Sequence, residues 1–189
     1  MRSLCFISDI MEYKAKPTGR PSDYYVIGLF GAGGIFWILP NFQKSFAAFY
    51  QFIAILMFSA AMYLLIRYRL TVFRFRVEGR NGDGFDIRAA MPEELDFVVE
   101  KSRGKGSLAL ARLSLGQLKS VSAVEYKELH DLTKDASLYK YYADMSPDEV
   151  VLVIFDDGER DIAMAVDLSQ EMINFLKSVA KQNLSGSVS

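Results

Sequence analysis

Cysteine and histidine are almost absent from this sequence, and with them most of the chemistry that those side chains support. The 189 residues include one cysteine, Cys5, and one histidine, His130. One cysteine excludes an intrachain disulfide framework, and one imidazole in a polar stretch leaves too few ligands for a zinc site. No pair of nucleophile and base is apparent either. We therefore expect no enzymatic activity, no metal and no cofactor.

An excess of positive charge is lacking as well. The chain has 22 Lys and Arg against 23 Asp and Glu, a formal net charge of −1. Proteins that bind nucleic acid normally present a basic surface, so we expect no nucleic-acid partner. The charges are unevenly spread, since residues 1–70 carry 7 basic and 3 acidic side chains, whereas residues 71–189 carry 15 basic and 20 acidic ones. This asymmetry divides the chain into two parts of different character.

Two long segments contain no charged residue. Residues 24–43 and 45–66 are free of Asp, Glu, Lys and Arg, and about twenty residues at about 1.5 Å each can cross a hydrocarbon layer of about 30 Å. A buried core helix is the alternative, but such helices are shorter and usually carry a polar face. The sequence therefore predicts a transmembrane helical hairpin over residues 24–66. The small residues expected where its helices meet are Gly28, Ala32, Ser59, Ala60 and Ala61.

Basic residues flank this hairpin on one side. Before it come Arg2, Lys14, Lys16 and Arg20, and after it come Arg67, Arg69, Arg74, Arg76 and Arg80, whereas the turn has only Lys44. By the positive-inside rule both termini are cytoplasmic, so we expect a multi-pass protein of the cell (inner) membrane. Four of these arginines, Arg67, Arg69, Arg74 and Arg76, form a basic cluster that we expect at the membrane interface, each contributing about 1 kcal/mol against anionic lipid.

The remainder of the chain has the pattern of a mainly antiparallel β domain. Residues 72–77 alternate apolar and basic side chains, as a half-buried strand does. Further strands are expected near 85–88, 95–101, 108–113, 119–126, 138–143, 150–155 and 161–166. The apolar spacing of residues 168–179 predicts a closing helix with Asp167 as its cap. Residues 183–189 are expected to be a flexible tail.

A series of about seven strands closed by an amphipathic helix, directly after two membrane helices, resembles the small bacterial membrane proteins that carry a pleckstrin-homology-like (PH-like) domain in the cytoplasm. The features that carry this resemblance are the first strand after the hairpin (67–77), the hairpin over 96–114, Tyr139–Tyr142 and the closing helix (169–181). The resemblance implies an α+β fold, in which the β strands form a PH-like barrel or sandwich. It also implies a membrane-tethered binding or scaffold module.

Lipid-binding members of the PH class hold a phosphorylated head group with a basic loop between early strands. The residues here that correspond to such a loop are Lys101, Arg103, Lys105 and Arg112. Their cationic groups are able to form charge-assisted bonds to an anionic head group. The alternative is an ordinary solvated hairpin, which the acidic character of the surrounding domain favours.

These patterns give four segments: a cytoplasmic N-terminal segment (1–23), the hairpin (24–66), the PH-like domain with its helix (67–182) and the tail (183–189). The expected function is that of a membrane-anchored, non-catalytic binding or scaffold module. Its expected partners are the lipid bilayer and either another protein or a further copy of the chain. The alternative is an accessory or regulatory subunit of a larger membrane enzyme or transporter.

Overall fold

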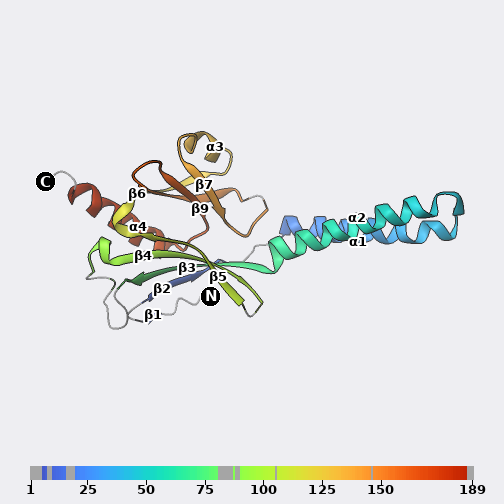
Figure 1. Ribbon diagram of the computed structural model, residues 1–189, viewed down its shortest axis with the longest axis horizontal. Helices are drawn as coiled ribbons and strands as arrows, with labels where there is room; N and C mark the ends of the chain where they lie inside the picture. Colours follow the sequence, from blue (N-terminus) through green and yellow to red (C-terminus); the bar gives the residue numbers. More distant parts are fainter. Residues whose placement is uncertain are drawn as a thin grey trace. The chain divides into compact units, whose positions relative to one another are not determined.

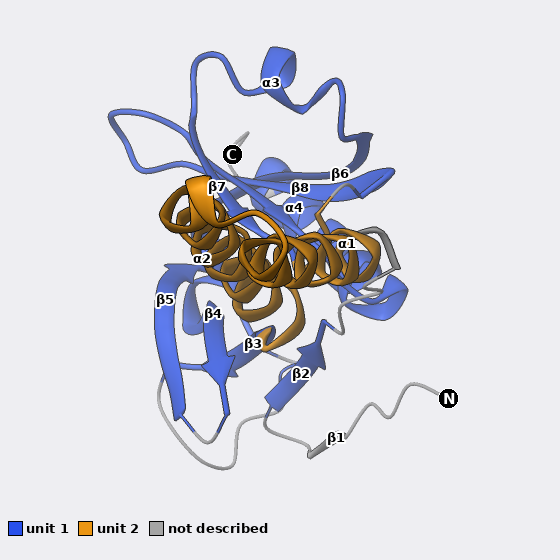
Figure 2. Ribbon diagram, turned by 90° about the vertical axis from the view of Figure 1, so that its right-hand side faces the viewer, with its two compact units in different colours: residues 1–16, 72–142, 147–189 blue, residues 17–71, 143–146 orange. Residues whose placement is uncertain are grey.

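The computed structural model describes residues 6–7, 10–15, 20–80, 87, 90–104, 106–145 and 147–186. It contains two compact units, drawn in different colours in Figure 2. The helical unit comprises residues 17–71 and 143–146, and the β unit comprises residues 1–16, 72–142 and 147–189. The β unit therefore includes residues from before the helices as well as from after them.

The helical unit is a pair of antiparallel helices (Figure 1). Its elements are α1 (Arg20–Ile38), the short 3₁₀ turns η1 (Leu39–Asn41) and η2 (Lys44–Phe46), α2 (Ala47–Leu64) and a π-helical turn, η3 (Leu65–Arg69). Two stretches, Ser22–Asn41 and Lys44–Arg69, are long and apolar enough to cross a membrane. This confirms the prediction of two helices of membrane-spanning length and composition.

The two helices meet through a different glycine from the one expected. A Cβ atom on Gly33 would lie 2.8 Å from Cε1 of Phe58, whereas nothing lies within 4 Å of the corresponding position on Gly28. The Phe58 ring also packs against Phe30, with 5.9 Å between the ring centroids. Ala61, which was expected at the contact, is fully buried. The close approach of α1 to α2 therefore depends on Gly33, and the prediction for Gly28 is wrong.

The first sheet of the β unit has five strands. In spatial order these are β1 (Phe6–Ile7), β2 (Ile10–Lys14), β3 (Thr71–Gly79), β4 (Leu95–Arg103) and β5 (Gly106–Ser114). No pattern in the sequence predicted β1 or β2. Met11 and Tyr13 are buried on one side of β2, opposite Val77 and Phe75 of β3, so the N-terminal segment extends this sheet.

The second sheet has four strands in the spatial order β6 (Leu118–Glu125), β8 (Glu149–Phe155), β9 (Ile162–Val166) and β7 (Ser137–Tyr141). It is mixed, because β7 pairs with β9 in parallel. The chain reverses at β8, so β7 and β9 run the same way. Gly158 closes the turn between β8 and β9 with a φ of +83°, and its N–H donates to Asp156 Oδ1 at 2.9 Å. The described strands thus form two sheets and not a closed barrel.

Aromatic side chains join the two sheets. The ring of Phe97 stacks on Phe75 from β3 and on Phe155 from β8, with centroid separations of 6.2 and 6.1 Å. All three side chains are completely buried. A second, smaller cluster includes Leu129 of the short helix α3 (Leu129–Leu132) and Leu152 of β8. Together these contacts form a mixed α+β unit with an interior shared by both sheets.

The closing helix, α4 (Gln170–Gly186), differs from the prediction at both ends. Ser169 caps it, since its Oγ accepts a hydrogen bond from the N–H of Met172 at 3.3 Å, and the expected cap at Asp167 is therefore wrong. At the other end Asn183 donates to the carbonyl oxygens of Leu115 (2.8 Å) and Leu118 (3.0 Å). Residues 183–186, expected in a flexible tail, are helical. Of the strand expected near residues 85–88, only Ile87 lies within the described residues.

Candidate functional site

The five-stranded sheet carries a charged face on the side away from its apolar core. Along β3 the buried residues Phe75 and Val77 alternate with half-buried Arg76 and Glu78. On β4, Phe97 points into the core and its neighbour Asp96 lies on the other side. We call this surface the charged face; its members are Glu12, Arg74, Arg76, Glu78, Arg80, Asp96, Glu100 and Arg112.

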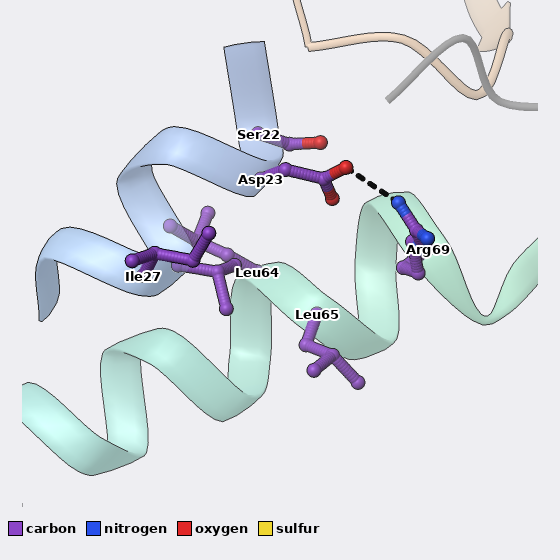
Figure 3. Close-up of a pocket in the computed structure, with 7 residues that line it drawn as sticks. Ser22, Asp23, Ile27, Leu64, Leu65 and Arg69 are labelled. Carbon is purple, nitrogen blue, oxygen red and sulfur yellow. Dashed lines mark hydrogen bonds and ion pairs between the residues drawn. The ribbon is translucent and has the colours of Figure 1, made fainter. Parts of the chain in front are cut away.

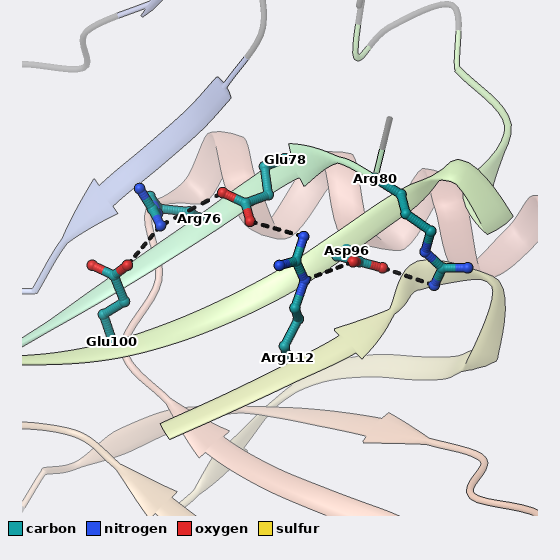
Figure 4. Close-up of polar contacts among 6 residues, drawn as sticks. All are labelled: Arg76, Glu78, Arg80, Asp96, Glu100 and Arg112. Carbon is teal, nitrogen blue, oxygen red and sulfur yellow. Dashed lines mark hydrogen bonds and ion pairs between the residues drawn. The ribbon is translucent and has the colours of Figure 1, made fainter. Parts of the chain in front are cut away.

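Ion pairs run across the strands of this face (Figure 4). Arg76 Nη2 lies 2.6 Å from Glu100 Oε1 and 3.5 Å from Glu78 Oε2. The other oxygen of Glu78 lies 3.1 Å from Arg112 Nη2. Glu100 of β4 thus contacts Arg76 of the neighbouring strand β3, and Glu78 of β3 contacts Arg112 of β5, on the far side of β4. Opposite charges therefore meet across the sheet, an arrangement that stabilises strand pairing.

Asp96 is the most enclosed acid of the charged face. It is only 4% exposed, and its two oxygens accept hydrogen bonds from Arg80 Nη2 at 2.9 Å and from Arg112 Nε at 2.8 Å. Burial raises the pKa of Asp96, but the hydrogen bonds and positive charges of Arg112 and Arg80 lower that pKa by more, so it lies below its ordinary value. The hydrogen bond to Asp96 in turn raises the pKa of Arg112. The Asp96 carboxylate and the Arg112 guanidinium are therefore charged at neutral pH.

A hollow of about 630 Å³ lies beside Asp96. Its lining residues are Arg80, Glu93, Asp96, Arg112, Leu113, Ser114, Gly116 and Gln117. The two arginines in it are balanced by two acids, so the hollow has no large excess charge for capturing a free anion or cation. Among the described residues, no group of three or more His, Cys, Asp or Glu is arranged to hold a metal ion. The hollow therefore presents polar hydrogen-bonding groups without a large net charge.

Of the four residues predicted to bind a head group, the structure describes Lys101, Arg103 and Arg112, and it places Arg112 apart from the other two. Arg103 pairs with Gly106 at the tip of the β4–β5 hairpin, whereas Arg112 pairs with Val98 near the other end. Six residues of extended strand separate the tip from Arg112, about 20 Å. Lys101 lies near the tip, and Lys105 lies outside the described residues. The structure thus keeps Lys101 and Arg103 together and joins Arg112 to the acids of the charged face.

The basic cluster expected after the second helix is divided between the two units. Arg74 Nε lies 3.0 Å from Glu12 Oε1, and Arg76 forms ion pairs with Glu78 and Glu100. Arg69 forms an ion pair with Asp23 at 2.5 Å. Since these three arginines face carboxylates, their positive charge is partly neutralised before any lipid approaches.

The guanidinium of the remaining member, Arg67, lies 5.4 Å from the ring centroid of Tyr68. In the helical unit, the Asp23–Arg69 ion pair lies at the edge of a pocket of about 300 Å³ (Figure 3). Ser22 and four apolar side chains line the rest of it; the apolar ones are Val26, Ile27, Leu64 and Leu65. Both partners of the pair are largely exposed, so the pair contributes little to stability, about 0 to 1 kcal/mol.

The acids of the charged face were not among the residues predicted from the sequence. Asp96 and Glu100 interrupt the apolar first part of β4, residues 95–100, and those two charges in a buried segment were the available signal. Their partners come from other strands, so their role depends on strand pairing. Comparison of the chain with protein-family models, with curated proteins and with solved structures gave no match.

Proposed function

We propose that this chain is a membrane-anchored, non-catalytic binding module, in which α1 and α2 span the bilayer and the β unit binds a protein partner at the cytoplasmic face. The observation that carries the proposal is the exposure of the two apolar helices. Only 11% of either candidate span is buried within the protein, and large side chains such as Ile35 (63%) and Phe52 (60%) are mostly exposed. A continuous apolar surface of this kind is unfavourable in water and suits a lipid environment.

Aromatic residues near the helix ends support the same assignment. Tyr24 at one end of the helical hairpin is 76% exposed, and Trp37 near the other end is 53% exposed. Rings with a polar edge favour the two interfaces of a bilayer. Basic residues are more numerous at the Asp23–Arg69 end than at the Lys44 end, which supports cytoplasmic termini by the positive-inside rule.

The electrostatics of the β unit support binding more than acid–base catalysis. A general acid or base works best with a pKa near the working pH. On the charged face, the pKa of Asp96 lies below its ordinary value and that of Arg112 lies above it. Both shifts move the pKa values away from neutral pH. The two groups therefore keep their charges near that pH and exchange protons poorly.

The second candidate, an accessory subunit of a larger membrane enzyme or transporter, is favoured by one observation. Gly28, Gly31 and Gly34 of α1 have open space where a side chain would lie. Small residues let membrane helices approach closely, so a helix of another protein could pack there. Affinity purification in mild detergent separates the two candidates: a stoichiometric membrane protein favours the accessory subunit.

Membrane extraction and cysteine labelling test the proposal. The full chain is expected to stay with membranes after an alkaline carbonate wash, and its release into the supernatant would refute the anchor. For topology, Gln43→Cys in the turn and Lys181→Cys on α4 are compared in a Cys5→Ser background. An impermeant thiol reagent should label Gln43→Cys in intact cells and Lys181→Cys only after lysis. The reverse pattern would refute cytoplasmic termini.

A further inference from the structure

The pocket of the helical unit has an apolar part and a charged edge (Figure 3). Its volume of about 300 Å³ is at the lower end of the range for sites that hold small ligands. The apolar side chains that line it are Val26, Ile27, Leu64 and Leu65. The Asp23–Arg69 ion pair forms the charged edge. A ligand that suits both parts needs an apolar segment next to charged groups, as an amphiphile has.

The ion pair occupies only part of each charged group. It joins Nη1 of Arg69 to Oδ2 of Asp23. A guanidinium has five N–H donors and a carboxylate has two acceptor oxygens, so Arg69 has further donors, and Asp23 has Oδ1, to offer to a ligand. The two side chains are 58% and 41% exposed, so a ligand reaches them without separating the pair. A group that carries both a positive and a negative charge matches this edge, whereas a simple anion is repelled by the carboxylate.

The pocket lies at the same end of both candidate membrane spans. Asp23 is the second residue of the span Ser22–Asn41, and Arg69 is the last residue of the span Lys44–Arg69. When the helices cross a bilayer, the ion pair therefore lies at the level of the head groups and the apolar part of the pocket lies toward the acyl chains. Phospholipid is the amphiphile that surrounds such a pocket. The inference rests on the proposed function in this respect, since it requires α1 and α2 to span the membrane.

A π-helical turn shapes the Arg69 side of the pocket. The N–H of Leu70 donates to the carbonyl oxygen of Leu65, five residues back, at 3.1 Å. Thr71 Oγ1 donates to the carbonyl oxygen of Ile66 at 2.9 Å. Leu65 and Arg69 are the first and last residues of this turn, and both line the pocket. π-helical turns are rare and frequently occur at functional sites, so the irregular backbone supports a binding role for this end of the hairpin.

We propose that this pocket binds one phospholipid whose head group carries a primary ammonium group, the chemistry of phosphatidylethanolamine. The lipid phosphate accepts hydrogen bonds from Arg69, and the ammonium group donates to Oδ1 of Asp23. Both are charge-assisted bonds, which are stronger than bonds between neutral groups. The apolar part of the pocket holds the adjoining part of an acyl chain. A choline head group has no N–H to donate to Asp23, and a glycerol head group has no positive charge, so both should bind less well.

Native mass spectrometry of the full chain in mild detergent tests this selectivity. The probes are phosphatidylethanolamine, phosphatidylcholine and phosphatidylglycerol with identical acyl chains. Phosphatidylethanolamine should bind about tenfold more tightly than the other two, because the loss of one charge-assisted hydrogen bond has about that effect. Equal affinity for the three lipids would indicate only a general lipid layer around the helices and would overturn the proposal. Tighter binding of phosphatidylcholine or phosphatidylglycerol would overturn it as well.

Substitutions of the ion pair assign the two head-group contacts. Asp23→Ala should abolish the preference for phosphatidylethanolamine over phosphatidylglycerol, because the acceptor of the ammonium group is lost. Arg69→Gln should weaken phosphatidylethanolamine binding about tenfold, because the charged partner of the phosphate is lost. The matched control is Arg74→Gln, which alters the partly exposed Arg74–Glu12 ion pair of the β unit and should change neither result. A preference that persists in Asp23→Ala would overturn the inference.

A third variant tests the apolar part of the pocket. Val26→Phe adds volume there and should weaken phosphatidylethanolamine binding, because the larger side chain occupies the space of the acyl chain. Its control is Ile35→Phe, at a residue of α1 that is 63% exposed and outside the pocket lining. Unchanged binding by Val26→Phe would overturn the proposal. A carbonate wash of the native chain keeps the test independent of the anchor: a retained chain without lipid selectivity refutes only the pocket, and a released chain refutes the anchor.

Discussion

Asp96 offers the sharpest test of the charged face, because one buried carboxylate holds two arginines from different parts of the sheet. In Asp96→Asn, the side chain keeps its shape but loses its charge and one acceptor oxygen. In Asp96→Ala, both hydrogen bonds are lost. If these ion pairs stabilise the sheet, both variants should lower the free energy of unfolding of the β unit. Asp96→Ala should lower it more than Asp96→Asn.

The expected magnitudes follow from the two bonds that Asp96 accepts. A hydrogen bond to a charged group contributes about 1.5 to 3 kcal/mol. The side chains of Arg80 and Arg112 are each 54% exposed, so water solvates them when the acid is removed and the lower figure applies. We expect a loss of about 3 kcal/mol for Asp96→Ala and about 2 kcal/mol for Asp96→Asn, a large part of the 5 to 15 kcal/mol typical of a domain.

Pulse proteolysis of the full chain in detergent, across a urea series, measures this loss. Asp157→Asn is the matched control, since Asp157 is an exposed acid in the β8–β9 turn. It should change the unfolding midpoint by less than the equivalent of about 0.5 kcal/mol. A change that small for Asp96→Ala would refute the view that the carboxylate stabilises the sheet.

The pH dependence of the same measurement provides a second readout. Because the pKa of Asp96 is lower in the folded chain than its ordinary value of 3.8, its contribution is fully present above that ordinary value. It is lost as the pH falls below 3.8 toward the folded pKa. The native chain should therefore lose stability more steeply in this acidic range than Asp96→Asn, and equal slopes would contradict the depressed pKa.

Three further substitutions test the packing. Gly33→Ala should weaken the contact between α1 and α2, because the new Cβ would lie 2.8 Å from Phe58. Crosslinking between the two helices measures this contact, and the second substitution Phe58→Leu should restore it. Asn183→Ala removes two hydrogen bonds to backbone carbonyls and should cost about 1 to 3 kcal/mol by pulse proteolysis, which an unchanged midpoint would contradict. Arg69→Ala should cost less than about 1 kcal/mol in detergent unfolding, since its ion pair with Asp23 is exposed; a larger loss would mean that the pair is desolvated.

The sequence pattern of a single segment predicted those helices and strands that depend mainly on the residues of that segment. The charge-free runs predicted α1 and α2, and the alternation at residues 72–77 predicted β3 with its arginines away from the core. β2 escaped prediction because five residues are a weak signal, and its partner, β3, follows almost sixty residues later, after both helices. The parallel β7–β9 pair was missed for the same reason, since pairing between distant strands is not written in either strand alone.

The candidate site also combines features that are visible in one segment with features that depend on pairing between distant strands. The arginines of β3 and the basic tip of the β4–β5 hairpin were visible in the sequence, and they indicated an anion-binding surface. The acids that pair with the β3 arginines come from β2 and β4 as well as from β3 itself. Whether an arginine is available to a ligand therefore depended on strand order and register, which the composition of one strand does not determine.

On the charged face, arginines already hold carboxylates, so a further anion has to displace an internal partner. If the β unit binds anionic head groups, the binding therefore falls to Lys101 and Arg103 near the tip of the β4–β5 hairpin. From about 0.05 to about 0.5 M salt the Debye length falls from about 14 Å to about 4 Å. Binding to anionic vesicles through these two side chains should weaken strongly over that range. Vesicle binding that does not fall with salt would refute an electrostatic role for Lys101 and Arg103.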